Sequence, residues 1–247
     1  MIKKVLTFAF AGLLLVWLFA ANFFLSSYSD SEGVCREVKI EVIDNSEGRF
    51  ISENEIKSIL INSGKLPTGR KSDEINTTAI EETLLKNRLI KKAECFKTVN
   101  GNVKIRVYQR TPVLRIFTDR GSFFVDKERE IMPVPHNFAA YVPVASGYIT
   151  DDYARNQLYG FALFLQGDKF WNSQIEQIYV EPNLDVELIP AVGGHRIIIG
   201  KIEDYKENLK KLLLFYDKGL NKTGWNRYSV INLKFKNQVV CKLKNEN

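Results

Sequence analysis

The hydrophobic pattern that follows residue 35 begins with a small unit of strands and helices. Apolar and polar residues alternate from Val38 to Val42, which predicts a half-buried strand. Two stretches with helical spacing come next. Ser52 with Glu55 and Thr78 with Glu81 form capping-box signatures at their starts, so we expect two helices there.

Two further strands complete this small unit. Ala93–Val99 and Asn102–Tyr108 flank Asn100-Gly101, a dipeptide that favours a type I′ hairpin turn. The predicted order is therefore β-α-α-β-β.

Beyond Pro112 the pattern changes to short strands separated by turn residues. The predicted strands are Val113–Thr118, Ser122–Val125, Tyr141–Val144, Ile175–Val180, Leu184–Ile189, Arg196–Ile199, Ser229–Phe235 and Gln238–Leu243. Two stretches with helical spacing each predict a helix with one core-facing stripe. Their stripes are Ala154, Leu158, Phe161, Ala162 and Leu165, and Tyr205, Leu209, Leu212, Leu213 and Tyr216. The fold class is α+β, with the last two strands forming a hairpin about Lys236-Asn237.

An uncharged apolar run precedes both units. Val5 to Leu25 contains no charged residue, and as a helix it would be roughly 31 Å long, close to the thickness of a bilayer's hydrocarbon core. The apolar core of a cleaved signal peptide is shorter, roughly 7 to 15 residues. We therefore expect a transmembrane helix over residues 5–25, with a cleaved signal peptide as the alternative.

The flanking charges orient this helix. Lys3 and Lys4 precede it, so the positive-inside rule leaves residues 1–4 in the cytoplasm and the rest of the chain outside. The whole chain has a formal charge of +6, of which these two lysines supply a third. The remaining charge is too mild and too evenly spread to indicate nucleic-acid binding.

Composition excludes several classes of protein. Of 247 residues, 45% are hydrophobic, 26% are charged and three are Cys, which rules out a disordered chain, a collagen and a disulfide scaffold. His136 and His195 stand alone in turn-like settings, and no nucleophile elbow, phosphate loop or dinucleotide motif occurs. We predict no catalytic residue, no metal, no cofactor and no small-molecule substrate.

Three cysteines would lie outside the cytoplasm, where disulfides can form. Cys35 and Cys95 belong to the small unit, and a bridge between them would close a loop of about 60 residues and add ~4 kcal/mol of stability. The alternative is three free thiols, with Cys241 as the third.

Four motifs follow one another along the chain. They are Gln109-Arg110-Thr111-Pro112-Val113, Phe123-Phe124-Val125-Asp126, Gly193 to Gly200 and Tyr228 to Val240. With the single span and the two units, they resemble the FtsQ/DivIB family of bacterial cell division proteins. They are similar to that family's E/Q-R-x-P junction, its y-v-D strand, its G-x-x-v-x-l-G segment and its closing strand pair. Arg129-Glu130 stands where the family has Gly, and Asn232, Lys234 and Phe235 replace Asp, Arg and Tyr.

The resemblance implies a domain organisation. Residues 1–4 would be a cytoplasmic end, 5–25 the transmembrane helix, 26–34 a linker, 35–110 a POTRA domain and 111–247 a β domain. It further implies a non-enzymatic component of the divisome in the bacterial inner membrane. The ectodomain would be periplasmic and the protein would localise to the midcell division site.

The family's partners are the FtsB and FtsL homologues and other divisome proteins, and the complex helps to control septal peptidoglycan synthesis. By position in the closing motif, the resemblance assigns partner contact to Lys234, Phe235, Asn237 and Gln238. The residue pattern supports this, because a final strand that ends a sheet offers unpaired backbone groups to an incoming strand. Alternatively, Phe235 is core and the lysines only guard a free edge.

Two other functions are consistent with the sequence. One is an envelope assembly scaffold of the POTRA type, and the other is a membrane-anchored periplasmic enzyme that acts on the cell wall.

Overall fold

The computed structural model describes residue 14 and residues 16–21, 33–43, 48–135 and 139–244. Most of the predicted transmembrane helix lies outside these residues, as do the predicted cytoplasmic end, most of the predicted linker, and His136. Residues 16–21 are helical. Within the described ranges, no helix combines the length and the apolar character needed to cross a membrane.

The chain divides into two compact units, which we describe separately. Unit 1 contains Met1–Ile43 and Ser52–Tyr108, and unit 2 contains Asp44–Ile51 and Gln109–Asn247. The expected α+β class is confirmed, because unit 1 has the order β-α-α-β-β and unit 2 is rich in strands.

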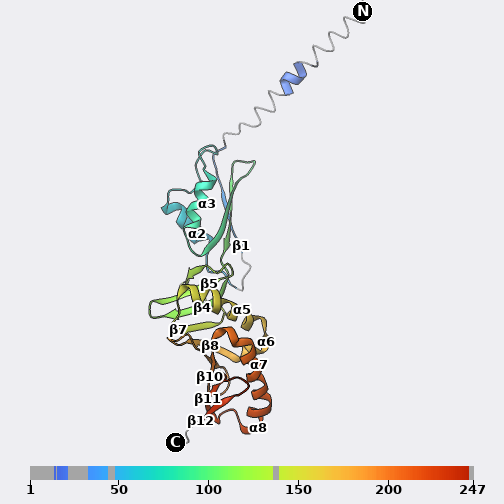
Figure 1. The fold of residues 1–247 in the computed structure, drawn as a ribbon. Coiled ribbons are helices and arrows are strands. Elements are labelled where there is room, and N and C mark those ends of the chain that lie inside the picture. Colours follow the sequence, from blue (N-terminus) through green and yellow to red (C-terminus); the bar gives the residue numbers. More distant parts are fainter. Residues whose placement is uncertain (1–13, 15, 22–32, 44–47, 136–138, 245–247) are drawn as a thin grey trace, which may run out of the picture. The chain divides into compact units, whose positions relative to one another are not determined.

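Unit 1 is a three-stranded sheet with two helices against one face (Figure 1). Its elements are β1 (Val38–Ile43), α2 (Glu53–Asn62), α3 (Thr77–Leu85), β2 (Ile90–Lys97) and β3 (Val103–Gln109). β3 lies between β1 and β2 and pairs with β1 in parallel. The buried apolar side chains include Val42, Ile56, Leu60, Ile80, Leu84, Ile90, Val103 and Ile105.

Of the two predicted capping boxes, the one at the start of α2 is present and the one at the start of α3 is not. The capping box at Ser52 is confirmed, since its Oγ accepts a hydrogen bond from the Glu55 backbone N–H (3.2 Å) and its own N–H donates to the Glu55 carboxylate (2.7 Å). The box predicted at Thr78 is wrong, because Asn76 caps α3. Glu81 instead accepts from the backbone N–H of Cys95 (2.7 Å) and so ties α3 to β2.

The turn between β2 and β3 is not type I′. Gly101 has φ +78°, whereas Asn100 keeps a negative φ. The Gly101 N–H donates to the Thr98 carbonyl (3.0 Å) and the Thr98 N–H donates to the Asn102 carbonyl (2.8 Å). These bonds define a three-residue loop, residues 99–101, in which only the last residue, Gly101, has the left-handed conformation that favours glycine.

Unit 2 is built on a nine-stranded sheet with the order β12-β11-β10-β9-β8-β7-β4-β5-β6. The strands are β4 (Pro112–Thr118), β5 (Gly121–Asp126), β6 (Ile131–Pro133), β7 (Val144–Gly147), β8 (Ile175–Val180), β9 (Val186–Pro190), β10 (Arg196–Gly200), β11 (Tyr228–Asn232) and β12 (Val240–Leu243). β4, β7 and β8 are mutually parallel, and β10 is parallel to β11.

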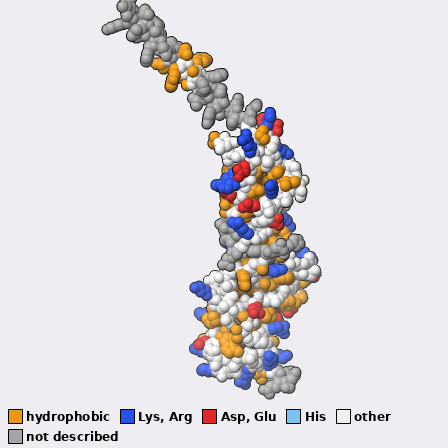
Figure 2. Space-filling view, turned by 180° about the vertical axis from the view of Figure 1, so that it is seen from behind, with side chains coloured by type: hydrophobic (Ala, Val, Ile, Leu, Met, Phe, Trp, Pro, Cys, Tyr) orange, Lys and Arg blue, Asp and Glu red, His pale blue; other side chains and the backbone are white. Residues whose placement is uncertain are grey.

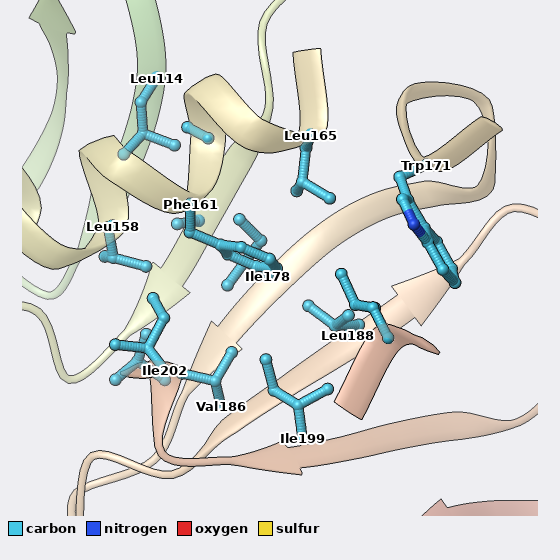
Figure 3. Packing of buried hydrophobic residues seen from close by; sticks show 14 of the residues in the cluster. Leu114, Leu158, Phe161, Leu165, Trp171, Ile178, Val186, Leu188, Ile199 and Ile202 are labelled. Atoms are coloured by element: carbon cyan, nitrogen blue, oxygen red, sulfur yellow. The ribbon is translucent and has the colours of Figure 1, made fainter. Parts of the chain in front are cut away.

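Helical segments cover one face of this sheet and bury its core (Figure 3). They are α4 (Asp151–Tyr153), α5 (Tyr159–Gly167), α6 (Lys169–Gln174), α7 (Tyr205–Phe215), α8 (Asn221–Thr223), the 3-10 turn η2 (Ile202–Asp204) and two π-helical turns, η1 (Ala154–Leu158) and η3 (Tyr216–Leu220). Phe161 of α5 lies over Ile178 of β8 (Figure 3). Leu188 and Ile199 belong to the same core cluster as Leu209 and Leu212 of α7.

Two predicted strands are placed differently. The strand predicted at Tyr141–Val144 is β7, which begins at Val144, and Tyr141 is 99% exposed. The strand predicted to run to Phe235 ends at Asn232, because the Asn232 side chain accepts a hydrogen bond from the backbone N–H of Lys234 (3.0 Å) and turns the chain out of the ladder.

Candidate functional site

The strand β12 forms one edge of the nine-stranded sheet. It pairs with β11 on one side, and no described strand pairs with it on the other. Cys241 packs partly against the core, whereas Val240 and Leu243 are 44% and 54% exposed. This edge combines unpaired backbone groups with exposed apolar side chains, which is what the addition of a further strand requires.

The hydrogen bonding indicates which backbone groups of β12 point outward. The Lys244 N–H donates to the Arg227 carbonyl (2.9 Å), so Lys244 faces β11. Successive residues of a strand direct their backbone groups to opposite sides. The Cys241 N–H and C=O and the Leu243 N–H are therefore the backbone groups that an incoming strand would meet, whereas the Leu243 carbonyl already accepts a hydrogen bond from the Ser229 hydroxyl of β11 (3.2 Å).

The loop between β11 and β12, residues 233–239, is fixed by a side chain from α7. Lys211 Nζ donates to the carbonyl oxygens of Leu233 (2.6 Å) and Phe235 (2.9 Å). Leu233 is fully buried, but Phe235 is 50% exposed. The chain leaves the ladder at Asn232, so the alternative in which Phe235 is a core residue is wrong.

A groove of about 540 Å³ lies between this loop and α7; we call it the terminal groove. Asn237 and Gln238 line it from the loop. The opposite wall comes from α7 and η3, and includes Leu214 and Phe215. Asn237 has φ +58°, a conformation that Asn tolerates better than most residues, so its side chain is well suited to this tight position.

Sequence reasoning missed the α7 wall of the groove. Leu213 was predicted to face the core, but it is 46% exposed, and its neighbour Leu214 is 56% exposed. The available signal was the run of three leucines, Leu212 to Leu214, because one core-facing stripe does not need three consecutive apolar residues. Seen from behind, unit 2 carries apolar patches among scattered basic side chains (Figure 2).

Lys234 is engaged within the chain. Its Nζ lies 2.5 Å from Asp185 Oδ2, and Lys201 Nζ lies 3.4 Å from Asp185 Oδ1. The hydrogen bond from Lys234, helped by Lys201, holds the pKa of Asp185 below its usual range despite the desolvation that opposes it. Gly200 makes room for this arrangement, because a Cβ there would lie 2.8 Å from Lys234 Cγ. An acidic group on a partner would have to compete with Asp185.

The four predicted contact residues therefore fall into two groups. Phe235, Asn237 and Gln238 lie at or beside the terminal groove and the β12 edge. Lys234 points to the neighbouring Asp185 instead.

His195 lies in the connection between β9 and β10, which agrees with the turn-like setting predicted for it, but its side chain is buried. It is 2% exposed, and its Nε2 lies 3.5 Å from the Tyr216 hydroxyl. Burial lowers its pKa below the ordinary value, although a hydrogen bond to the backbone of Trp225 opposes the shift. Gly193 and Gly194 therefore lead into a core residue.

This burial predicts a pH dependence of stability. The unfolded chain takes up a proton on His195 near pH 6.5, but the folded chain resists it until a lower pH. The free energy of unfolding should therefore fall below about pH 6.5, by up to ~1.4 kcal/mol per pH unit, until the folded pKa is reached. Urea unfolding of wild type and His195→Gln between pH 7 and pH 5 tests this. Equal pH slopes for the two proteins would contradict it.

Cys35 and Cys95 are buried in unit 1 as free thiols. Burial raises the pKa of Cys95 to about 12, and the nearby Glu81 and Cys35 add smaller shifts in the same direction. The thiolate needed for exchange is therefore scarce while the unit is folded. A bridge would form most readily before the unit closes.

We predict that the protein isolated from an oxidising compartment carries a Cys35–Cys95 disulfide. Denatured but unreduced protein should then take up one alkylating group, on Cys241, and three after reduction, as counted by mass spectrometry. Three groups without reduction would show that the thiols stay free. Denaturation is essential, because the folded thiols would react slowly in either case.

Two of the sequence motifs meet in unit 2. Arg110 Nη1 donates to Asp126 Oδ2 (2.6 Å), and the carboxylate is fully buried. Asp126 Oδ1 accepts from the backbone N–H groups of Glu128 (2.9 Å) and Glu130 (2.7 Å). The pair joins the start of β4 to the turn between β5 and β6. Asp126 therefore holds two segments of unit 2 together and does more than stabilise the turn that follows β5.

Comparison with known families matches both parts of the chain. The family model described as FtsQ/DivIB, C-terminal related, matches residues 111–242. The model of the POTRA-like domain matches residues 33–108. No curated protein matches the chain.

Proposed function

This chain belongs to the FtsQ/DivIB family, and we propose that it is a membrane-anchored, non-enzymatic scaffold of the bacterial divisome. In this proposal residues 5–25 span the inner membrane, residues 1–4 are cytoplasmic, and the POTRA domain (35–110) and the β domain (111–247) are periplasmic. The protein acts at the midcell division site.

The partner surface is the edge of β12, and the partner is the complex of the FtsB and FtsL homologues. The observation that carries this assignment is the open edge itself, with two residues whose backbone groups point outward and a groove beside it. A strand of the partner would pair with Cys241 and Leu243. Each backbone bond adds only ~0.5 to 1.5 kcal/mol and is blind to sequence, so side chains must supply selectivity.

The terminal groove is suited to supply that selectivity. It lies beside the residues that precede β12, and its walls combine Leu214 and Phe215 with Lys211 and Lys218. An apolar side chain from the partner would bury in such a groove, and an acidic neighbour would meet Lys218, because Lys211 donates to the loop carbonyls and Glu207 lines the groove from the same helix. Phe235, Asn237 and Gln238 would contact the partner from the loop.

Binding at this edge would link the scaffold to septal peptidoglycan synthesis. Unit 1 would serve recruitment of other divisome proteins, as POTRA domains of the family do. Neither role requires a catalytic group.

Depletion of the protein in its native bacterium, followed by microscopy with a fluorescent fusion, tests the proposal. We expect midcell fluorescence in dividing cells, and filaments or chains of cells after depletion. The FtsB homologue should then be captured with the wild-type protein from cross-linked cells.

Two other results would redirect the assignment. Uniform envelope fluorescence with normal septation would reject the division role in favour of a general envelope scaffold. Extraction of the protein from membranes by alkaline carbonate would reject the anchor over residues 5–25 without affecting the edge assignment.

A further inference from the structure

A second cavity, of about 670 Å³, opens where three parallel strands end. β7 pairs in parallel with β4 on one side and with β8 on the other, so the carboxyl ends of all three meet at one edge of the sheet. In open sheets, ligands commonly bind beyond the carboxyl ends of parallel strands. This cavity does not include any residue of β12 or the terminal groove.

Three aromatic side chains line the cavity, one from or next to each of these strands. Phe117 is 39% exposed, Tyr148 is 61% exposed and Tyr179 is 37% exposed. Exposed rings that gather around one hollow mark a binding surface more often than scattered ones do. Tyrosine adds a hydroxyl to each apolar ring and so suits a ligand with both kinds of surface.

Gly147 shapes the chain where two of these aromatic residues reach the cavity. It has φ +104°, and a Cβ at this position would overlap the carbonyl oxygen of Val180 and approach the Tyr179 ring to 3.1 Å. The next residue, Tyr148, donates its backbone N–H to that same carbonyl (2.8 Å). The chain therefore turns sharply at the end of β7, and Tyr148 lines the same cavity as Tyr179.

The cavity lining contains one acidic and one basic side chain, whose opposite charges nearly cancel. Asp119 and Arg120 carry opposite charges, and Arg120 Nη2 lies 3.6 Å from Asp151 Oδ1. Within the described part of the chain, Asp119 forms no ion pair. The hollow thus offers a carboxylate acceptor and guanidinium donors with no excess of positive charge, so it does not favour an anion.

We propose that this cavity binds a neutral, hydroxyl-rich oligosaccharide. The flat C–H faces of sugar rings would cover Tyr148, Tyr179 and Phe117, and sugar hydroxyls would donate to Asp119 and accept from Arg120. Cavities of roughly 300 to 1,000 Å³ suit small ligands, and this one has room for a short saccharide segment.

A proline-rich peptide is the other ligand that aromatic grooves commonly bind. It fits less well here, because proline has no N–H and a carboxylate can only accept hydrogen bonds. A run of prolines would bring no backbone N–H to Asp119, so a peptide could satisfy this carboxylate only through its other residues. Sugar hydroxyls both donate and accept, so they satisfy Asp119 and Arg120 together.

The test uses the full-length protein with chitotetraose and cellotetraose as probes, in saturation-transfer NMR and calorimetry. We expect at least one tetrasaccharide to bind, and Tyr148→Ala to weaken it about tenfold, the effect of losing one stacking ring. Tyr179→Ala should act in the same direction. Tyr141→Ala is the matched control, because Tyr141 is 99% exposed and lies outside the cavity lining.

Three outcomes would overturn the proposal. They are failure of both tetrasaccharides to bind, binding that survives the Tyr148→Ala and Tyr179→Ala changes together, and equal loss with Tyr141→Ala. Binding of a proline-rich peptide that depends on Tyr148, with no saccharide binding, would assign the cavity to peptides. Because β12 does not contribute, a failure here leaves the proposed partner edge untouched.

Discussion

Asp126→Ala is expected to lower the free energy of unfolding of unit 2 by about 3 to 5 kcal/mol, the cost of breaking a buried ion pair from one side. The change removes the acceptor of three hydrogen bonds from a site with no exposure. It leaves the Arg110 guanidinium, whose side chain is 21% exposed, without its partner. Urea unfolding followed by tryptophan fluorescence measures the loss, because Trp171 is buried in the core of unit 2.

Asp151→Ala is the matched control for this change. Asp151 also pairs with an arginine, Arg120, but both side chains are more than half exposed and 3.6 Å apart. Exposed pairs contribute little, so its effect should stay within about 0.5 kcal/mol. Equal losses for Asp126→Ala and Asp151→Ala would show that the buried pair does not hold unit 2 together.

Leu243→Pro is expected to weaken binding of the FtsB–FtsL complex about tenfold or more. Proline removes the outward N–H of Leu243 and places its ring where the partner strand must lie. The backbone hydrogen bonds between β11 and β12 are not involved, because the Leu243 N–H points to the open side, and the Leu243 carbonyl that accepts from the Ser229 hydroxyl (3.2 Å) is kept in proline. Calorimetric titration of the full-length protein with the purified complex measures the affinity.

Leu243→Ala distinguishes the contribution of the Leu243 backbone N–H to binding from that of its side chain. Alanine removes the same exposed leucine but keeps the N–H, so strand pairing predicts a much smaller loss for Leu243→Ala than for Leu243→Pro. The Tm of both variants should stay close to that of wild type. Equal losses of affinity would mean that the partner contacts only the side chain and that the edge is not paired.

Most of the elements could be predicted from the sequence, but several of their ends could not. Tyr141 to Val144 is rich in residues that favour strands, and only parallel pairing with β4 and β8 selects Val144–Gly147 as β7. Asn76 and Thr78 are both good helix caps, and the local pattern cannot rank them. Contacts with other parts of the fold decide where such a strand or helix begins, and the local sequence pattern does not show those contacts.

The candidate site was predictable only in part, for a similar reason. An open terminal strand follows from the strand pattern, but the terminal groove needs α7 beside the loop, and that depends on the parallel pairing of β10 with β11. The partner of Lys234 was also hidden, since Asp185 is far away in sequence. His195 follows two glycines, which hid its burial beneath Tyr216.

The short edge that would accept a partner is also protected from copies of itself. Lys242 lies within β12, and Lys236 and Lys244 flank it. Two copies that met edge to edge would bring these ammonium groups close to one another, and like charges on facing strands repel. If the protein is concentrated at a division septum, as proposed, the same strand would therefore remain available to a partner without promoting aggregation of the protein.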